Sequence, residues 1–269
     1  MRARDRAWIA LQYALPHHAL SALVGRVARV ESRWLRRALI RGFLRHYPVN
    51  LAEAEIPDPE AYASFNQFFT RALAAGARPL AAVADAVLSP CDGVVSACGE
   101  IDGEQLPQAR LAAKSRWYTL TELLGDAAIA AEFVGGSFAT IYLAPQDYHR
   151  VHVPLAGELQ EVIRIPGRLF SVDACTALAV PRLFARNARV VCRLATGAGP
   201  VAVVLVGALN VGSMDIVGRG RLACGAELGR FNLGSTVIVL LPRGRCGWLP
   251  ALAPGARLQV GAAIGRLKA

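Results

Sequence analysis

The stretch Val-Val-Cys-Arg-Leu-Ala-Thr-Gly-Ala-Gly-Pro-Val-Ala-Val-Val-Leu, residues 190–205, holds two apolar runs of strand length separated by glycine and proline. Similar runs recur on both sides of it, at residues 93–97, 137–143 and 236–241. Short valine-rich runs bounded by turn-forming or charged residues favour β-strands. From about residue 87 onward, the sequence therefore predicts a β-rich domain of mostly antiparallel strands.

Residues 1–48 are predicted to be helical, with a break at Pro16. Leu20, Leu23, Val24 and Val27 follow one another at helical spacing and would share one face of a helix. Two prolines within residues 49–60 disfavour helix in that connector. The expected fold class is α+β, with an amphipathic helical region (1–48) ahead of a β-rich domain (49–269).

Two short helices are expected inside the second region. One is predicted over Ser64–Ala74 and one over residues 119–124. Neither changes the fold class, because the strand-like runs outnumber them.

The net charge of +10 is concentrated at the N-terminus. Ten arginines lie between Met1 and Tyr47, against Asp5 and Glu31. A basic terminal segment indicates an acidic partner, either nucleic acid or anionic lipid. No apolar run reaches the ~18 residues of a spanning helix, so membrane association would be in-plane. An ordinary surface helix packing on its own domain explains the pattern equally well.

The chain has six cysteines but no Cys-x-x-Cys pair, which argues against a zinc or thioredoxin-like site. We expect free thiols in a reducing cytoplasm. The first residues lack the apolar segment and cleavage site of a signal peptide.

Three short stretches carry residues suited to chemistry. Asp92 lies in the turn 89–93, His149 and His152 lie in 148–154, and Ser235 precedes an apolar run. Taken singly, a turn aspartate or a serine before a strand is most often structural. The histidines have no third partner at metal-ligand spacing, so no metal site is expected.

Together these stretches resemble the phosphatidylserine decarboxylase family, in its bacterial membrane-associated branch. The matching blocks, in the family's order, are residues 66–71, 89–93, 142–154, 167–172, 183–187, 206–213 and 233–236. Three positions depart from the common pattern. Cys224 replaces a lysine, and Asp173 and Ala188 replace asparagine and glutamate.

The resemblance implies decarboxylation of phosphatidylserine to phosphatidylethanolamine through a Schiff base with a covalent pyruvoyl group derived from Ser235. It also implies self-cleavage between Gly234 and Ser235, which leaves a heterodimer of a long N-terminal and a short C-terminal chain. A homo-oligomer remains open.

The same resemblance suggests roles for the polar residues. The Ser235 hydroxyl would attack the Gly234 carbonyl, and His152 would remove its proton while Asp92 fixes the tautomer of His152. His149 would deliver the proton that replaces carbon dioxide. From the residues alone, the two histidines could exchange roles, and the resemblance assigns them. The assignment requires the fold to bring these residues together.

The implied location is the cytoplasmic face of the cell membrane, as a peripheral protein on an anionic surface, with no nucleic-acid partner. One alternative is a Ser-His-Asp hydrolase acting on lipids or esters, although Ser235 does not lie in a Gly-x-Ser-x-Gly turn. Another is a lipoyl or biotinyl carrier, but neither Lys114 nor Lys268, the only lysines, lies in a convincing hairpin.

Overall fold

The computed structural model describes residues 3–103, 110–113, 116–209, 213–232 and 235–268. Its helices are α1 (Ala3–Ala14), α2 (His17–Ala28), α3 (Arg33–His46), α4 (Phe65–Phe69), α5 (Leu120–Leu124), α6 (Ala127–Ala131), α7 (Ala174–Ala179) and α8 (Leu183–Arg186), with 3-10 turns at Leu51–Glu53 and Pro59–Ala61. Its strands are β1 (Ala86–Leu88), β2 (Gly93–Glu100), β3 (Arg110–Ala113), β4 (Arg116–Thr119), β5 (Ser137–Leu143), β6 (Arg150–His152), β7 (Gly157–Ile165), β8 (Arg189–Thr196), β9 (Gly199–Val206), β10 (Met214–Ile216), β11 (Gly220–Leu222), β12 (Glu227–Phe231), β13 (Ser235–Leu241), β14 (Cys246–Trp248), β15 (Arg257–Leu258) and β16 (Ala263–Leu267).

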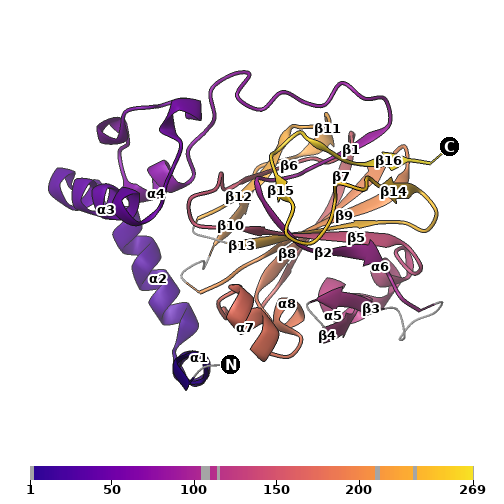
Figure 1. Cartoon of the computed structure of the whole chain (residues 1–269), viewed down its shortest axis with the longest axis horizontal. Helices are drawn as coiled ribbons and strands as arrows, with labels where there is room; N and C mark the ends of the chain where they lie inside the picture. Colours follow the sequence, from indigo (N-terminus) through magenta and orange to yellow (C-terminus); the bar gives the residue numbers. More distant parts are fainter. Residues whose placement is uncertain (1–2, 104–109, 114–115, 210–212, 233–234, 269) are drawn as a thin grey trace.

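The principal sheet has eight strands in the order β11-β7-β8-β9-β13-β5-β2-β15, and its neighbours pair antiparallel. Smaller sheets have the orders β1-β16-β14, β10-β12-β6 and β3-β4. In Figure 1, the short helices α5 to α8 lie on one side of the principal sheet, and β1, β6 and β16 lie on the other. The predicted α+β class with mostly antiparallel strands is confirmed.

The interior strands of the principal sheet are buried on both faces. Residues 237–241 of β13 and 201–206 of β9 are all fully buried. A strand covered on both faces gains from an apolar side chain at every position, so its sequence shows a continuous run and no alternation. This explains why the apolar runs in the sequence marked β5, β9 and β13. The runs also marked β2 and β8, although part of each of these strands is only half-buried.

The N-terminal helices break at Pro16, as predicted, and again between α2 and α3, which was not predicted. They stand beside the β-rich body in Figure 1. Ile9 of α1 belongs to the main core, whereas α2, α3 and α4 share a separate apolar cluster formed by Ala28, Ile40, Tyr62, Phe65, Phe68 and Phe69. Among the described residues, no helix is both long and apolar enough to cross a bilayer.

The packed face of α2 differs from the predicted apolar stripe. Its buried residues are His17, Ser21 and Ala28. Leu23 and Val27, which belong to the stripe, are 56% and 37% exposed. His17 is hydrogen-bonded to α1 and to the β-rich body, and Ala28 packs in the cluster shared with α3 and α4. Much of the apolar stripe of α2 therefore faces outward.

The predicted helix over Ser64–Ala74 is too long. Ser64 caps the start of α4 through the backbone amide of Gln67, at 3.2 Å. The helix ends at Phe69, and the next residues form an extended pairing in which the Glu55 amide donates to the Ala72 carbonyl and the Ala74 amide to the Glu53 carbonyl. Backbone pairing of residues 72–74 with residues 53–55 ends the helix early. A local sequence pattern does not reveal a pairing between two separate segments.

Candidate active site

The register of the principal sheet places Asp92 and Ser235 at the same edge. Val94 of β2 and Thr236 of β13 pair with the same residue of β5, Tyr142, from opposite sides. Asp92 directly precedes β2, and Ser235 is the first residue of β13. Because neighbouring strands lie about 4.8 Å apart, β2 and β13 are separated by about 10 Å. The fold thus brings two predicted site residues, distant in sequence, to one end of β5.

Both histidines reach this edge on the chain that leaves β5. That chain turns through residues 144–149 into β6, which ends at His152. The backbone amide of His152 donates to the Pro90 carbonyl at 2.7 Å, which places β6 beside the turn that carries Asp92. Gly93 in this turn tolerates no side chain, since a Cβ there would lie 2.4 Å from the Tyr142 carbonyl oxygen. The turn, β5 and β6 therefore form one closely packed unit.

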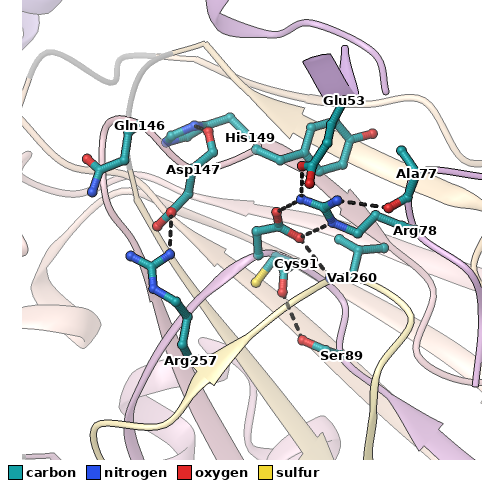
Figure 2. A network of polar contacts seen from close by, with 12 residues as sticks. Glu53, Ala77, Arg78, Ser89, Cys91, Gln146, Asp147, His149, Arg257 and Val260 are labelled. Carbon is teal, nitrogen blue, oxygen red and sulfur yellow. Dashed lines mark hydrogen bonds and ion pairs between the residues drawn. The ribbon is translucent and has the colours of Figure 1, made fainter. Parts of the chain in front are cut away.

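The Asp92 carboxylate is held by Arg78, whose side chain is 10% exposed and lies beside Glu53 in Figure 2. Arg78 donates from Nε to Oδ1 at 3.2 Å and from Nη2 to Oδ2 at 2.7 Å, and the Val260 amide donates to Oδ1 at 2.8 Å. Arg78 also contacts Glu53, at 2.8 Å. Burial lowers the pKa of Arg78, but the hydrogen bonds to Asp92 and Glu53 outweigh it and raise that pKa overall. Asp92 is therefore a fixed carboxylate with satisfied oxygens.

His152 has two partners, and Asp92 is not one of them. Its Nδ1 lies 2.8 Å from the Gly225 carbonyl oxygen, and its Nε2 lies 3.0 Å from the Tyr148 hydroxyl. A carbonyl only accepts, so Nδ1 carries the proton and the Tyr148 hydroxyl donates to Nε2. The expected contact from Asp92 to His152 is thus replaced by Gly225, which fixes the tautomer. Burial lowers the pKa of His152, and the Asp92 charge acts weakly in the opposite direction.

His149 is fully buried and stacks against Phe69, with ring centroids 4.2 Å apart. Its Nδ1 lies 2.8 Å from the Asp147 carbonyl oxygen, which makes Nδ1 the protonated nitrogen. Its Nε2 is buried and has no hydrogen-bond partner among the described residues. Burial lowers the pKa of His149 to about 3. The ring is therefore neutral near pH 7, and its unpartnered nitrogen is an acceptor.

The structure describes only part of the predicted cleavage site. Gly234 lies outside the described residues, and Ser235 is described by its backbone alone. Asn232, two residues before Gly234, is well anchored. Asn232 donates to the Ser213 hydroxyl at 2.8 Å and to the Asp215 carboxylate at 2.9 Å, and it accepts from Asn66 at 3.1 Å. These contacts fix the chain shortly before β13.

The sequence analysis missed three residues that contact the predicted ones. Arg78 and Tyr148 bind the Asp92 and His152 side chains, and Gly225 binds His152 through its backbone. Tyr148 stands next to His149 in a block that was already singled out, so proximity could have indicated it. Nothing in the sequence indicated Arg78 or the Gly225 carbonyl. Arginines in loops are common, and every residue has a backbone carbonyl.

Comparison with known proteins identifies the family of this chain. The family model described as "Phosphatidylserine decarboxylase" matches residues 65–266, and a second model described as "PSD" matches residues 7–48. A phosphatidylserine decarboxylase proenzyme of Azotobacter vinelandii is 48% identical over 98% of this chain and 99% of its own length. One of Pseudomonas aeruginosa is 51% identical over 89% of this chain and 90% of its own length. The chain therefore belongs to the phosphatidylserine decarboxylase family of carboxy-lyases.

Proposed function

We propose that this protein decarboxylates phosphatidylserine to phosphatidylethanolamine, after cleaving itself between Gly234 and Ser235. The observation that carries the proposal is the meeting of β2, β5, β6 and β13 at one sheet edge, which gathers Asp92, His152 and the start of β13. Family membership supplies the reaction, and this geometry supplies residues able to perform it.

A pyruvoyl group derived from Ser235 supplies the electron-accepting carbonyl that amino-acid decarboxylation requires. The surroundings suit such a group. His149 provides a buried nitrogen that lacks a partner in the part of the chain that the structure describes, near the sheet edge where β13 begins. An unpartnered buried acceptor is costly in a folded protein, which is understandable if the mature site gives it a partner.

In the self-cleavage step, His152 accepts the Ser235 hydroxyl proton through Nε2 as the oxygen attacks the Gly234 carbonyl. The lowered pKa keeps His152 neutral, and hence able to act as a base, near pH 7. The Tyr148 hydroxyl gives up its hydrogen bond to Nε2 in this step. Asp92 stabilises the resulting imidazolium through its charge, without direct contact. The Gly234–Ser235 C–N bond breaks as His152 returns the proton to the Ser235 nitrogen, which leaves an ester. Loss of the serine Cα proton and breaking of the Cβ–O bond then separate the two chains. The new N-terminal dehydroalanine takes up water and releases ammonia to become the pyruvoyl group.

In the decarboxylation step, His149 donates the proton that replaces carbon dioxide. Its neutral state in the free protein requires that substrate binding raise its pKa. A substrate carboxylate or phosphate beside the buried ring does so, because a nearby anion favours the imidazolium. His149 thus becomes a proton donor only when substrate is present.

The helical region 1–48 binds the anionic surface of the cell membrane as a peripheral element on the cytoplasmic face. Trp8, Leu11 and Trp34 are 38%, 50% and 75% exposed, and arginines lie among them. Exposed apolar side chains interleaved with cations are typical of interfacial helices. The amphipathic surface brings the catalytic domain to a substrate that never leaves the membrane.

The intact mass of the purified protein under denaturing conditions tests the proposal. Cleavage yields a chain of residues 235–269 with a blocked N-terminus, lighter than serine would give, and the Ser235→Ala variant stays whole. Vesicles containing phosphatidylserine should then release carbon dioxide only with the cleaved protein. Folded wild-type protein that stays uncleaved and reacts with a fluorophosphonate probe would favour the Ser-His-Asp hydrolase.

A further inference from the structure

A small polar cavity of about 250 Å³ opens beside the candidate active site. It is bounded by the 146–148 turn, residues 257–259 and the segment around residues 48–53. Asp92 and Tyr148 line it, so it adjoins the contacts of both Arg78 and His152. Figure 2 shows Arg257 and Asp147 on one side and Arg78 with Glu53 on the other. The cavity is smaller than the usual 300–1,000 Å³ of drug-sized ligand pockets, and it suits a headgroup.

Arg71, which lines this cavity, is a buried cation with unused donors. The residue is 5% exposed, and its Nη2 donates to the carbonyls of Gln146 and Asp147, at 3.0 and 3.4 Å. Its Nε and Nη1 have no hydrogen-bond partner among the described residues. The ion pairs between described residues at this cavity join other arginines to acidic residues such as Asp92 and Asp147, and do not include Arg71. Burial lowers the pKa of Arg71, yet a guanidinium stays charged near pH 7. Asp92 and Asp147 favour the charged form through their charge, but they leave these two buried donors without a partner, and unpartnered buried donors indicate an anionic ligand.

Arg257 provides a second cation on the outer side of the cavity. Its side chain is 64% exposed and, among the described residues, pairs with the Asp147 carboxylate at 3.2 Å. Asp147 is only 5% exposed, so Arg257 keeps this pair and presents its remaining guanidinium donors to a ligand. Arg78 differs, because its guanidinium is already engaged by Asp92 and Glu53. The cavity therefore offers two available cations, one inner and one outer.

We propose that this cavity binds the anionic part of the phospholipid headgroup, a phosphodiester bearing a carboxylate, with Arg71 as the inner partner and Arg257 as the outer one. The inference rests on the proposed function, since it assigns a substrate subsite to the same active site. Two separate cations match two separate anionic groups. Phosphatidylethanolamine lacks the carboxylate, so the product loses one of these contacts and leaves more easily.

Binding is measured in the uncleaved Ser235→Ala protein, which separates recognition from turnover. Isothermal titration with glycerophosphoserine should give saturable binding, with weaker binding of glycerophosphoethanolamine and of inorganic phosphate. Adding Arg257→Gln or Arg71→Lys should weaken glycerophosphoserine binding about tenfold, as expected for the loss of a hydrogen bond to a charged group. Arg243→Gln changes an exposed arginine beyond the far end of β13 and serves as the matched control.

Equal glycerophosphoserine affinity in the control and in Arg257→Gln would overturn the proposal, even if Arg71→Lys fails to fold. Inorganic phosphate binding as tightly as glycerophosphoserine would overturn the recognition of a carboxylate. Thermal denaturation of the same variants, compared with the Ser235→Ala parent, checks their folding. If binding depends on these arginines but the protein with Ser235 neither cleaves itself nor decarboxylates, the proposed function is wrong and the proposed subsite stands. Decarboxylation with arginine-independent binding would sink the subsite alone.

Discussion

The hydroxyl of Tyr148 lies 3.0 Å from Nε2 of His152, the ring nitrogen to which we assign the Ser235 proton. The other ring nitrogen is already committed to the Gly225 carbonyl. Donation from Tyr148 stabilises the neutral imidazole and so disfavours its protonation. Tyr148 is thus a positioning residue that both orients the ring and reduces its basicity.

Replacing Tyr148 with phenylalanine should shift the pH dependence of self-cleavage to higher pH. Loss of the donor to Nε2 raises the pKa of His152, so a higher pH is needed to keep the base neutral. Maturation rates of freshly refolded proenzyme, followed by mass across a pH series, give the midpoint. A midpoint that stays at the wild-type pH would mean that the hydroxyl does not influence the base.

The Arg78→Gln variant should lose about 3 kcal/mol or more of stability, because it leaves the Asp92 carboxylate buried without its cation. Both side chains of this pair are 10% exposed. Glu53 is 34% exposed in its pair with Arg78, so Glu53→Gln should cost only ~1 kcal/mol. Chemical denaturation measures both losses. The double variant Arg78→Gln, Asp92→Asn should recover part of the larger loss; equal, small losses in the two single variants would contradict a buried pair.

Stability should fall as the pH decreases below about 6.5, and His17 should contribute to the fall. Burial lowers the pKa of His17, and the nearby Arg168 charge adds to this, although the hydrogen bond to Gln12 opposes it. The unfolded chain then binds protons that the folded one does not, so acid favours unfolding. The His17→Gln variant should show a shallower decline in denaturation series from pH 7 to pH 5. The exposed His46→Gln variant is the control, and an equal effect of both would argue against this account.

Trp34→Glu should weaken binding to anionic liposomes about tenfold while leaving stability nearly unchanged. Trp34 is 75% exposed on α3, so its replacement disturbs little packing. Liposome co-sedimentation measures the affinity, and Trp117→Glu, at a side chain 47% exposed on β4, is the matched control. An equal loss of liposome affinity in both variants would contradict the proposal that α3 contacts the membrane surface.

Deletion of residues 1–48 is a harsher form of the same test. We expect it to weaken liposome binding and to spare self-cleavage, but the packing argues for point variants first. Ile9 belongs to the main core, and Gln12 bonds to Thr176 and to the backbone of Ser171. The truncated protein would therefore expose part of the body that α1 now covers.

The sequence predicted the strands that appear as uninterrupted apolar runs, such as residues 201–205. It did not mark β7, because the residues of that strand are mostly exposed or half-buried and form no apolar run. It predicted α4 poorly, since the end of that helix depends on pairing with residues 53–55. Local periodicity describes what a segment prefers on its own, and long-range backbone pairing can override that preference.

For the candidate site, the sequence identified residues better than contacts. Asp92, His149 and His152 are near one sheet edge, but the hydrogen bonds differ from the expected triad. Gly225 acts through a backbone carbonyl, and Arg78 reaches Asp92 from a separate loop. Such contacts depend on register and loop path, which no spacing rule specifies.

The position of β13 has a consequence for the two chains that cleavage would create. Residues 235–269 supply an interior strand of the principal sheet, flanked by β9 and β5, and also β14, β15 and β16. A cut before Ser235 leaves the hydrogen bonds between these strands intact. The short chain can therefore dissociate only if the principal sheet unfolds. Refolding after such a cut requires two molecules to meet, and recovery becomes dependent on concentration. The protein therefore folds as a single chain before cleavage. After cleavage, the folded structure is not readily re-formed from the two separated chains.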